Sequence, residues 1–242
     1  MKNFVPLFWL CLISFIWACD DTSCIDGEGP IVTENLELDD ISSFNLEGSF
    51  DVVVSQGTNQ NIVAEGYPNI ISALNTRVSN GHWDINFRER CVRSLRLTIF
   101  ITVPDLKAIK LTGSGSISVN DFDLEGESFN VDLIGSGDIL LNELNGLSSV
   151  SSFIEGSGNI NFLKLVDGID TESVYILGSG NCKGFNIEGD HVNAKLEGSG
   201  NIEVTANIIL DAIIEGSGNI YYKGSPQINS SIIGSGEIIN SN

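Results

Sequence analysis

The sequence predicts an all-β protein built as a right-handed parallel β-helix, a solenoid with coils of about 20 residues. Three observations lead to this fold class. A GSG-containing motif recurs along the chain, apolar residues hold fixed positions on both sides of it, and glycine is abundant, with 26 residues against 5 prolines. Glycine at this density breaks long helices and favours short strands joined by tight turns.

The GSG motif sets the period of the predicted coils. Its first glycine recurs every 18 to 22 residues. A period of this length is typical of stacked supersecondary units, and it holds about three short strands with their corners. The first glycines are Gly113, Gly135, Gly156, Gly178, Gly198, Gly216 and Gly234.

Apolar residues flank every copy of the motif. The residue two positions before the first glycine is leucine or isoleucine in all copies, and the residue four positions after it is isoleucine except at Cys182. Alternation on both sides of a turn indicates two short strands with inward apolar faces. Stacked coils would place these residues over one another at the strand spacing of about 4.8 Å.

A polar residue directly follows GSG in every copy. In four consecutive copies it is asparagine, and we expect these side chains to form a hydrogen-bonded ladder along one corner of the solenoid. Calcium binding is the alternative, but the glycine-rich calcium repeat has a period of about nine and an aspartate. The ladder residues are Asn159, Asn181, Asn201 and Asn219.

The chain before the first GSG is less regular. Residues 46–54, LEGSFDVVV, fit the same template with Phe50 in place of the second glycine, so they predict a first, degenerate coil. Between Gly57 and Lys110 the repeat is interrupted, and we expect this part to cap or precede the regular coils. The interruption contains edge or antiparallel strands near 61–65, 82–88 and 94–103, one helical turn at 68–73 and a turn at 79–81.

The first residues form a targeting segment. Lys2 precedes an apolar run that ends in Ile-Trp-Ala-Cys, and this ending resembles a bacterial lipobox. The resemblance implies cleavage before Cys19 and lipid attachment to it, although Trp17 is larger than the residue usual there. Asp20 and Asp21 resemble a signal for export to the outer surface. The alternative is an ordinary secretory signal cleaved near Ala18.

These segments give the expected domain organisation. A lipoprotein signal peptide covers residues 1–18, and a tether covers 19–30. An N-terminal β segment with the degenerate coil covers 31–110, and the regular repeats cover 111–242. We therefore expect a cell-envelope lipoprotein of the outer membrane, exposed at the surface and held to the membrane by its N-terminal lipid.

Three cysteines remain after Cys19, which permits at most one internal disulfide. Cys182 occupies an isoleucine position of the repeat, so we expect it to be a small buried apolar residue. The expected pair is therefore Cys24 with Cys91.

Charge excludes some partners. The chain has 32 acidic and 12 basic residues, a net charge of −20, and this disfavours nucleic acid and anionic lipid surfaces. The basic residues cluster around Arg88, Arg90, Arg93 and Arg96. They either pair with neighbouring acids or form a patch for an anionic group or partner. Trp83, close by, is expected in the core.

Catalytic patterns are missing from the sequence. His82 and His191 have no ligand residues at a metal-binding spacing, and no GxSxG motif occurs. Parallel β-helices include polysaccharide lyases and glycosidases, which use carboxylate pairs or calcium. Asp132 and Asp138 could flank one turn, a common arrangement in so acidic a chain. We expect no catalytic residues, metal or cofactor.

A family resemblance rests on an ordered set of motifs. The segments LEGSFDVVVSQG, SNGHWDINF and LTIFITVPDLKAIKLTGSGSI, followed by GSGDI and GSGNI repeats, resemble the putative auto-transporter adhesin, head GIN domain family over about residues 32–240. The resemblance implies a secreted or surface protein of stacked β-coils, and it carries no catalytic residues over.

The expected function is therefore a surface-anchored, non-catalytic module that binds a protein or glycan. One alternative is a structural envelope protein that assembles with copies of itself or with other lipoproteins. The other alternative is a polysaccharide-active enzyme.

Overall fold

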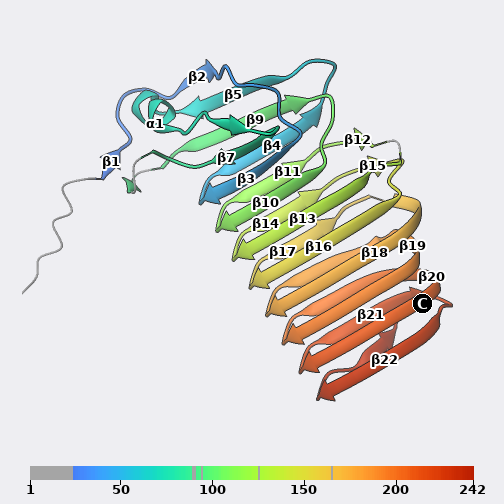
Figure 1. The fold of residues 1–242 in the computed structure, drawn as a ribbon. Coiled ribbons are helices and arrows are strands. Elements are labelled where there is room, and N and C mark those ends of the chain that lie inside the picture. Colours follow the sequence, from blue (N-terminus) through green and yellow to red (C-terminus); the bar gives the residue numbers. More distant parts are fainter. Residues whose placement is uncertain (1–23, 89–90, 94, 125, 165) are drawn as a thin grey trace, which may run out of the picture.

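The computed structural model describes residues 24–88, 91–93, 95–124, 126–164 and 166–242. They form a parallel β-solenoid of about six turns, with an N-terminal mixed sheet region and one short helix (Figure 1). The predicted fold class is confirmed. The predictions for residues 1–18, Cys19 and Arg90 concern residues outside the described part of the chain.

The N-terminal region comprises β1 (Ile25–Asp26), β2 (Val32–Asn35), β3 (Ser43–Gly48), β4 (Asp51–Gln56), β5 (Asn61–Gly66), α1 (Pro68–Ala73), β6 (Val78–Ser79), β7 (His82–Ile85), β8 (Val92–Arg93) and β9 (Leu97–Val103). The repeats comprise β10 (Ala108–Gly113), β11 (Ser116–Val119), β12 (Phe122–Asp123), β13 (Ser128–Gly135), β14 (Asp138–Leu141), β15 (Leu144–Asn145), β16 (Ser149–Gly156), β17 (Asn159–Phe162), β18 (Val166–Gly178), β19 (Asn181–Gly198), β20 (Asn201–Gly216), β21 (Asn219–Gly224), β22 (Gln227–Gly234) and β23 (Ile238–Asn240).

The GSG glycines lie in register from coil to coil. Gly135 aligns with Gly113 on one side and Gly156 on the other, and the same pairing continues to Gly234. The strands before and after GSG therefore form two parallel stacks, seen in Figure 1 as parallel arrows along the solenoid. One repeat of the sequence thus corresponds to one coil.

Close backbone contact explains why the motif requires glycine. Gly198 has φ 138°, and a Cβ atom there would lie 2.0 Å from the carbonyl oxygen of Gly178. That carbonyl accepts a hydrogen bond of 2.9 Å from the backbone amide of Ser199. A side chain at this position would both adopt a disfavoured backbone conformation and displace the neighbouring coil.

The predicted inward positions form the core of the solenoid. Each is completely buried from the first regular coil to the sixth, and Cys182 lies among them as expected. Because each coil covers the apolar face of the next, a continuous apolar interior runs along the stack. These fully buried residues are Leu111, Leu133, Ile154, Ile176, Leu196, Ile214, Ile117, Ile139, Ile160, Cys182, Ile202 and Ile220.

The degenerate coil is confirmed, because Leu46 aligns with Leu111 and Val52 aligns with Ile117. The interruption that follows it does more than cap the repeats. Strands β7 and β9 pair in parallel with β3 and β4 and so form a further coil on the outer side of the degenerate one. Our expectation of purely antiparallel or edge strands was therefore incomplete, because the chain doubles back before the regular repeats begin.

Antiparallel pairing and the helix close this end. Strand β5 pairs antiparallel with both β2 and β9, and the predicted helical turn is α1. The predicted turn at 79–81 joins β6 to β7, with positive φ angles of 52° at Asn80 and 72° at Gly81. Trp83 is fully buried there, and its Nε1 donates a 2.8 Å hydrogen bond to the carbonyl of Asn75.

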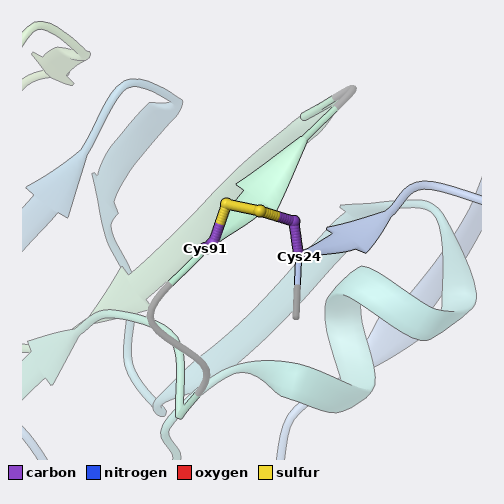
Figure 2. Close-up of a disulfide and its surroundings, with 2 residues drawn as sticks. All are labelled: Cys24 and Cys91. Atoms are coloured by element: carbon purple, nitrogen blue, oxygen red, sulfur yellow. A yellow bond between two sulfur atoms is a disulfide. The ribbon is translucent and has the colours of Figure 1, made fainter. Parts of the chain in front are cut away.

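A disulfide joins Cys24 to Cys91, as expected from the sequence (Figure 2). Next to it, β1 pairs in parallel with β8, and Asn69 bonds the backbone of Asp26 and Glu28. The predicted tether is therefore attached to the N-terminal region from Cys24 onward.

One acidic side chain interrupts the apolar interior. Glu172 is fully buried, and neither of its carboxylate oxygens has a hydrogen-bond partner. Burial, and then the nearby Glu172, raise the pKa of the Cys182 thiol. Burial raises the pKa of Glu172 well above its usual value, so the folded protein favours the protonated, neutral form of this carboxyl group.

Candidate functional site

The outer face of the strands that precede GSG carries the most distinctive surface of the solenoid. Because side chains alternate along a strand, the residue three positions before the first glycine points outward in each coil. Register aligns these residues into one outer row, and the row changes from basic to acidic, aromatic, basic, aliphatic and then polar along the stack. Its members are Lys110, Asp132, Phe153, Tyr175, Lys195, Ile213 and Ser231.

A second outer row consists of smaller polar side chains. It lies two residues earlier on the same strands, and its members are Ser151, Ser173, Asn193 and Asp211. Between the two rows lies a groove of about 350 Å³, which extends across β16, β18, β19 and β20. This volume is within the range of pockets that bind small ligands. We refer to this hollow as the outer groove.

Aromatic contacts form one wall of the outer groove. The rings of Phe153 and Tyr175 lie 5.4 Å apart between centroids at an angle of 47°. Lys195 Nζ lies 4.9 Å from the centroid of the Tyr175 ring on the next coil. Ile213 extends the wall and is 40 % exposed. The wall therefore offers apolar surface to solvent beside a row of hydroxyl, amide and carboxylate groups.

Glu197 holds this wall in place. It accepts hydrogen bonds from Tyr175 Oη at 2.8 Å and from Lys195 Nζ at 2.6 Å. The bond from Lys195, and then that from Tyr175, lowers the pKa of Glu197, while the same carboxylate raises the pKa values of Lys195 and Tyr175. Both side chains are therefore tied to one carboxylate, which restricts their rotamers and gives the groove a defined shape.

The asparagine row lies at a different corner. Asn181 donates to Asn159 Oδ1 at 2.9 Å, and Asn201 donates to Asn181 Oδ1 at 3.1 Å. Asn159 in turn donates to Asp138. Asn219 departs from the predicted pattern and donates to Tyr221 Oη, because that hydroxyl lies within 3.3 Å on its own strand. The bonds that Asn159, Asn181 and Asn201 donate join coils to one another.

The arginines do not gather around one pocket. Arg88, Arg93 and Arg96 are all exposed. Arg96 lines a hollow together with Asp51 and Glu65, whereas Arg88 bonds the hydroxyl of Thr76. The arrangement supports the reading that these cations are balanced by local polar groups more than the reading of a shared anion patch.

The fold brings Ser43, His82 and Asp84 together in the N-terminal region, a contact that the sequence did not predict. Ser43 Oγ lies 2.8 Å from His82 Nδ1, and His82 Nε2 lies 3.4 Å from Asp84. His82 and Asp84 are 41 % and 53 % exposed and line none of the hollows described here. Without a pocket to hold a substrate or exclude water, the contact resembles a surface hydrogen-bond chain more than an active site.

The described residues contain neither a metal-binding cluster nor a membrane-spanning helix. No group of histidine, cysteine or acidic side chains there could hold a metal ion. Within the same residues, no helix has the length and apolar character needed to cross a membrane.

The fold and its glycine corners can be compared with known proteins. Residues 41–226 match the family model described as putative auto-transporter adhesin, head GIN domain. This chain belongs to that family. A search of curated proteins gave no match.

Solved structures share the whole architecture. A putative adhesin from Bacteroides fragilis is 22 % identical, with a TM-score of 0.80, over 90 % of this chain and all of that one. A protein from Parabacteroides distasonis described as a putative lipid binding protein is 27 % identical, with a TM-score of 0.74 and the same coverage. A putative adhesin from Parabacteroides merdae is 22 % identical, with a TM-score of 0.68, over 91 % of this chain and all of that one.

Membership of an adhesin family implies a protein of the cell surface or the extracellular space, and the family's description indicates no catalytic role. The outer groove itself was missed at the level of sequence. Its signal was present, because the position three before the first glycine holds large side chains in four consecutive copies. The sequence pattern was interpreted only at the inward positions and at the polar residue that follows GSG.

Proposed function

We propose that this chain is a lipid-anchored protein of the outer membrane whose solenoid presents a rigid, non-catalytic binding surface at the cell exterior. The outer groove is the observation that supports this function best. It combines exposed apolar wall residues with a parallel row of polar groups, a composition typical of ligand-binding pockets. Its walls are strands of a stacked sheet, so ligand binding requires little ordering of the protein.

Anchoring is proposed through Cys19, on the evidence of the lipobox-like sequence. The test is protease treatment of intact cells that produce either the wild-type protein or Cys19→Ser. Digestion of the wild-type protein on whole cells, together with release or mislocalisation of Cys19→Ser, is the expected result. Protection of the wild-type protein until the outer membrane is broken would exclude a surface role.

Binding through the outer groove can be tested with a matched pair of variants on one strand. Ile213 lines the groove and is 40 % exposed, whereas Ile208 is 52 % exposed and is not among the groove's lining residues. Both lie in β20, and both can be changed to serine at similar cost. The purified protein would be tested on glycan and extracellular-matrix protein arrays, with a panel of fatty acids as a third arm. The fatty acids are included because one structural relative is described as a putative lipid binding protein.

Loss of a wild-type signal in Ile213→Ser, with retention in Ile208→Ser, is the expected outcome. Equal loss of the binding signal in both variants, or retention of the signal in both, would show that the ligand binds outside the outer groove. Turnover of any polysaccharide on the array would overturn the non-catalytic assignment.

A second candidate function is assembly with other envelope proteins or with copies of this chain. The observation that favours it is the apolar surface of β22, where Ile228, Ile232 and Ile233 are 38 %, 44 % and 67 % exposed. Ile228 and Ile232 continue inward rows, because they align with Leu210 and Ile214. Sedimentation analysis tests self-assembly: a concentration-dependent oligomer that Ile232→Glu dissociates would support it, and a monomer at high concentration would reject it.

A further inference from the structure

A second hollow lies on the strands that follow GSG, away from the outer groove. It measures about 540 Å³ and spans β17, β19, β20 and β21. We call it the lysine pocket. Its lining residues are Asn161, Phe162, Leu163, Lys183, Phe185, Asn186, Glu203 and Lys223.

Positive charge is concentrated there in an otherwise acidic chain. Only 12 of 242 residues are basic, yet Lys183 and Lys223 line the same hollow. Among the described residues neither of them forms an ion pair within 4.0 Å, although Glu203 aligns with Lys183 on the next coil. The pocket therefore contains two ammonium groups against one carboxylate, a local excess of one positive charge.

An aromatic ring forms part of the same wall. Lys223 Nζ lies 4.5 Å from the centroid of Phe185, which holds the ammonium group beside the ring. Leu163, at the rim, is 54 % exposed. Asn186 cannot contribute its amide to a ligand freely, because it donates to the carbonyl groups of Phe162 and Leu163.

One polar atom of the pocket lacks a partner. Asn161 Oδ1 is buried and accepts no hydrogen bond, although it belongs to a residue that lines the hollow. A buried acceptor without a donor costs free energy, so a rotation of the Asn161 side chain toward the hollow, where a ligand hydroxyl or N–H group would supply the missing donor, would be favoured. Asn161 aligns with Lys183, so the acceptor and the ammonium group lie on adjacent strands.

These groups together define a ligand. It must carry a negative charge for the two lysines, a hydroxyl donor for Asn161 Oδ1 and a C–H face for Phe185. A carboxylated sugar residue carries all three. We propose that the lysine pocket binds a single carboxylated sugar unit of a glycan, with the carboxylate at Lys183 and Lys223 and a hydroxyl group at Asn161.

The net charge of the whole protein narrows the class of acidic glycans that the lysine pocket can bind. A net charge of −20 repels densely charged polyanions, whereas it opposes a singly charged sugar unit much less. The proposal therefore concerns an isolated or terminal acidic sugar and excludes nucleic acid and highly sulfated chains. The site lies on different strands and residues from the outer groove, so it goes beyond the proposed function and can succeed or fail separately.

Three small probes test the proposal on the wild-type chain by NMR titration. Glucuronate differs from glucose only by its carboxylate, and acetate supplies the carboxylate without the sugar. Glucuronate is expected to bind in the millimolar range, to shift the resonances of the pocket residues and to weaken as salt rises. Glucose and acetate are each expected to bind at least about tenfold more weakly, a difference of one decade in Kd. Glucose or acetate binding as tightly as glucuronate would overturn the proposal.

Variants of the lysine pocket separate the contributions of its side chains to glucuronate binding. The double change Lys183→Gln and Lys223→Gln is expected to weaken glucuronate at least about tenfold. Asn161→Ala is expected to weaken glucuronate while leaving the response to acetate unchanged. Lys107→Gln removes one exposed positive charge that lies outside both the lysine pocket and the outer groove, so it serves as the matched control, and Ile213→Ser shows whether the outer groove is involved. Equal weakening by Lys107→Gln, or loss of glucuronate binding in Ile213→Ser, would overturn the assignment.

Discussion

Glu172 occupies space that Gly184 leaves open inside the solenoid. A Cβ atom at position 184 would lie 3.0 Å from Glu172 Oε1. In the neighbouring coils the same inward position holds Phe162 and Val204, so the glycine removes a large side chain and the glutamate enters the vacated volume. The carboxyl group gains room in this way, but it gains no hydrogen-bond partner.

Replacing Glu172 by an apolar residue of similar length should stabilise the protein. Glu172→Met removes the burial cost of two unpartnered oxygens and keeps the volume filled, so we expect a gain of about 2 kcal/mol in the free energy of unfolding at pH 7. Urea unfolding measures it. The control is Glu155→Met, an exposed position on the adjacent coil, which should change stability by no more than about 0.5 kcal/mol. A loss of stability in Glu172→Met would show that the carboxyl group is paired in solution.

Glu172 should also make the stability of the protein fall as pH rises. Burial raises the pKa of Glu172 in the folded state, whereas the unfolded chain has the ordinary value of 4.5. The contribution of Glu172 to the free energy of unfolding is therefore fully present below pH 4.5. It is lost progressively as pH rises above that value toward the pKa of the folded state. Comparing the melting temperature of the wild-type protein with that of Glu172→Gln across pH 5 to 9 isolates this effect. Parallel curves for the two proteins would contradict the assigned protonation state.

The GSG corner should tolerate no side chain. Gly198→Ala adds a Cβ 2.0 Å from a carbonyl oxygen at φ 138°, and we expect a loss of about 4 kcal/mol. Gly168 also has positive φ, 71°, but a Cβ there meets no atom within 4 Å. Gly168→Ala should therefore cost only about 1 kcal/mol, through backbone strain alone. Similar losses in both variants would mean that strain, and not coil contact, explains the motif.

Substitutions at an inward position and at a corner position of the same coil should differ strongly in their effect on stability. Ile202→Asp places a charge in a fully buried position and is expected to cost about 4 kcal/mol or to prevent folding. Asn201→Ala removes the bond to Asn181 Oδ1 at an accessible corner and should cost about 1 kcal/mol. Thermal unfolding of the two purified variants compares these effects. An unchanged melting temperature in Ile202→Asp would refute the inward assignment.

Reduction of the disulfide should weaken the N-terminal region. Cys24 and Cys91 are separated by 67 residues, and a bond across a loop of this length typically contributes about 2–4 kcal/mol. Unfolding with and without dithiothreitol measures the contribution. Cys182→Val should leave the response to dithiothreitol unchanged, since this thiol is free and buried. An effect of dithiothreitol in Cys24→Ser would point to another bridge.

Much of the fold followed from the repeat alone. The positions of Leu196 and Ile202 relative to Gly198 predicted which side chains face inward, because a strand alternates its faces and a stack aligns like positions. The degenerate coil at Leu46 was found by the same template. Cys24 and Cys91 could be paired because the template assigned Cys182 to the interior.

Other features depend on contacts that a linear pattern does not contain. Strands β7 and β9 have the alternation of any strand, so their sequence did not reveal that they pair in parallel with β3 and β4. Glu172 interrupts an inward row without a local signal, since its space comes from Gly184, which is 12 positions later. The outer groove and the lysine pocket arise from rows of outward residues on successive coils, and such rows become surfaces only after stacking.

The position of β7 and β9 also bears on how the chain folds after export. The coil formed by β3 and β4 is first in the sequence, yet it lies between β7/β9 on one side and β10/β11 on the other. An emerging chain that has reached only Gln56 thus exposes both edges of this coil, and exposed edges invite pairing with other chains. One edge is covered only when residues up to Val103 have crossed the membrane, and the other only when residues up to Val119 have crossed it. The earliest part of the solenoid consequently stays open to pairing with other chains until the regular repeats begin to emerge.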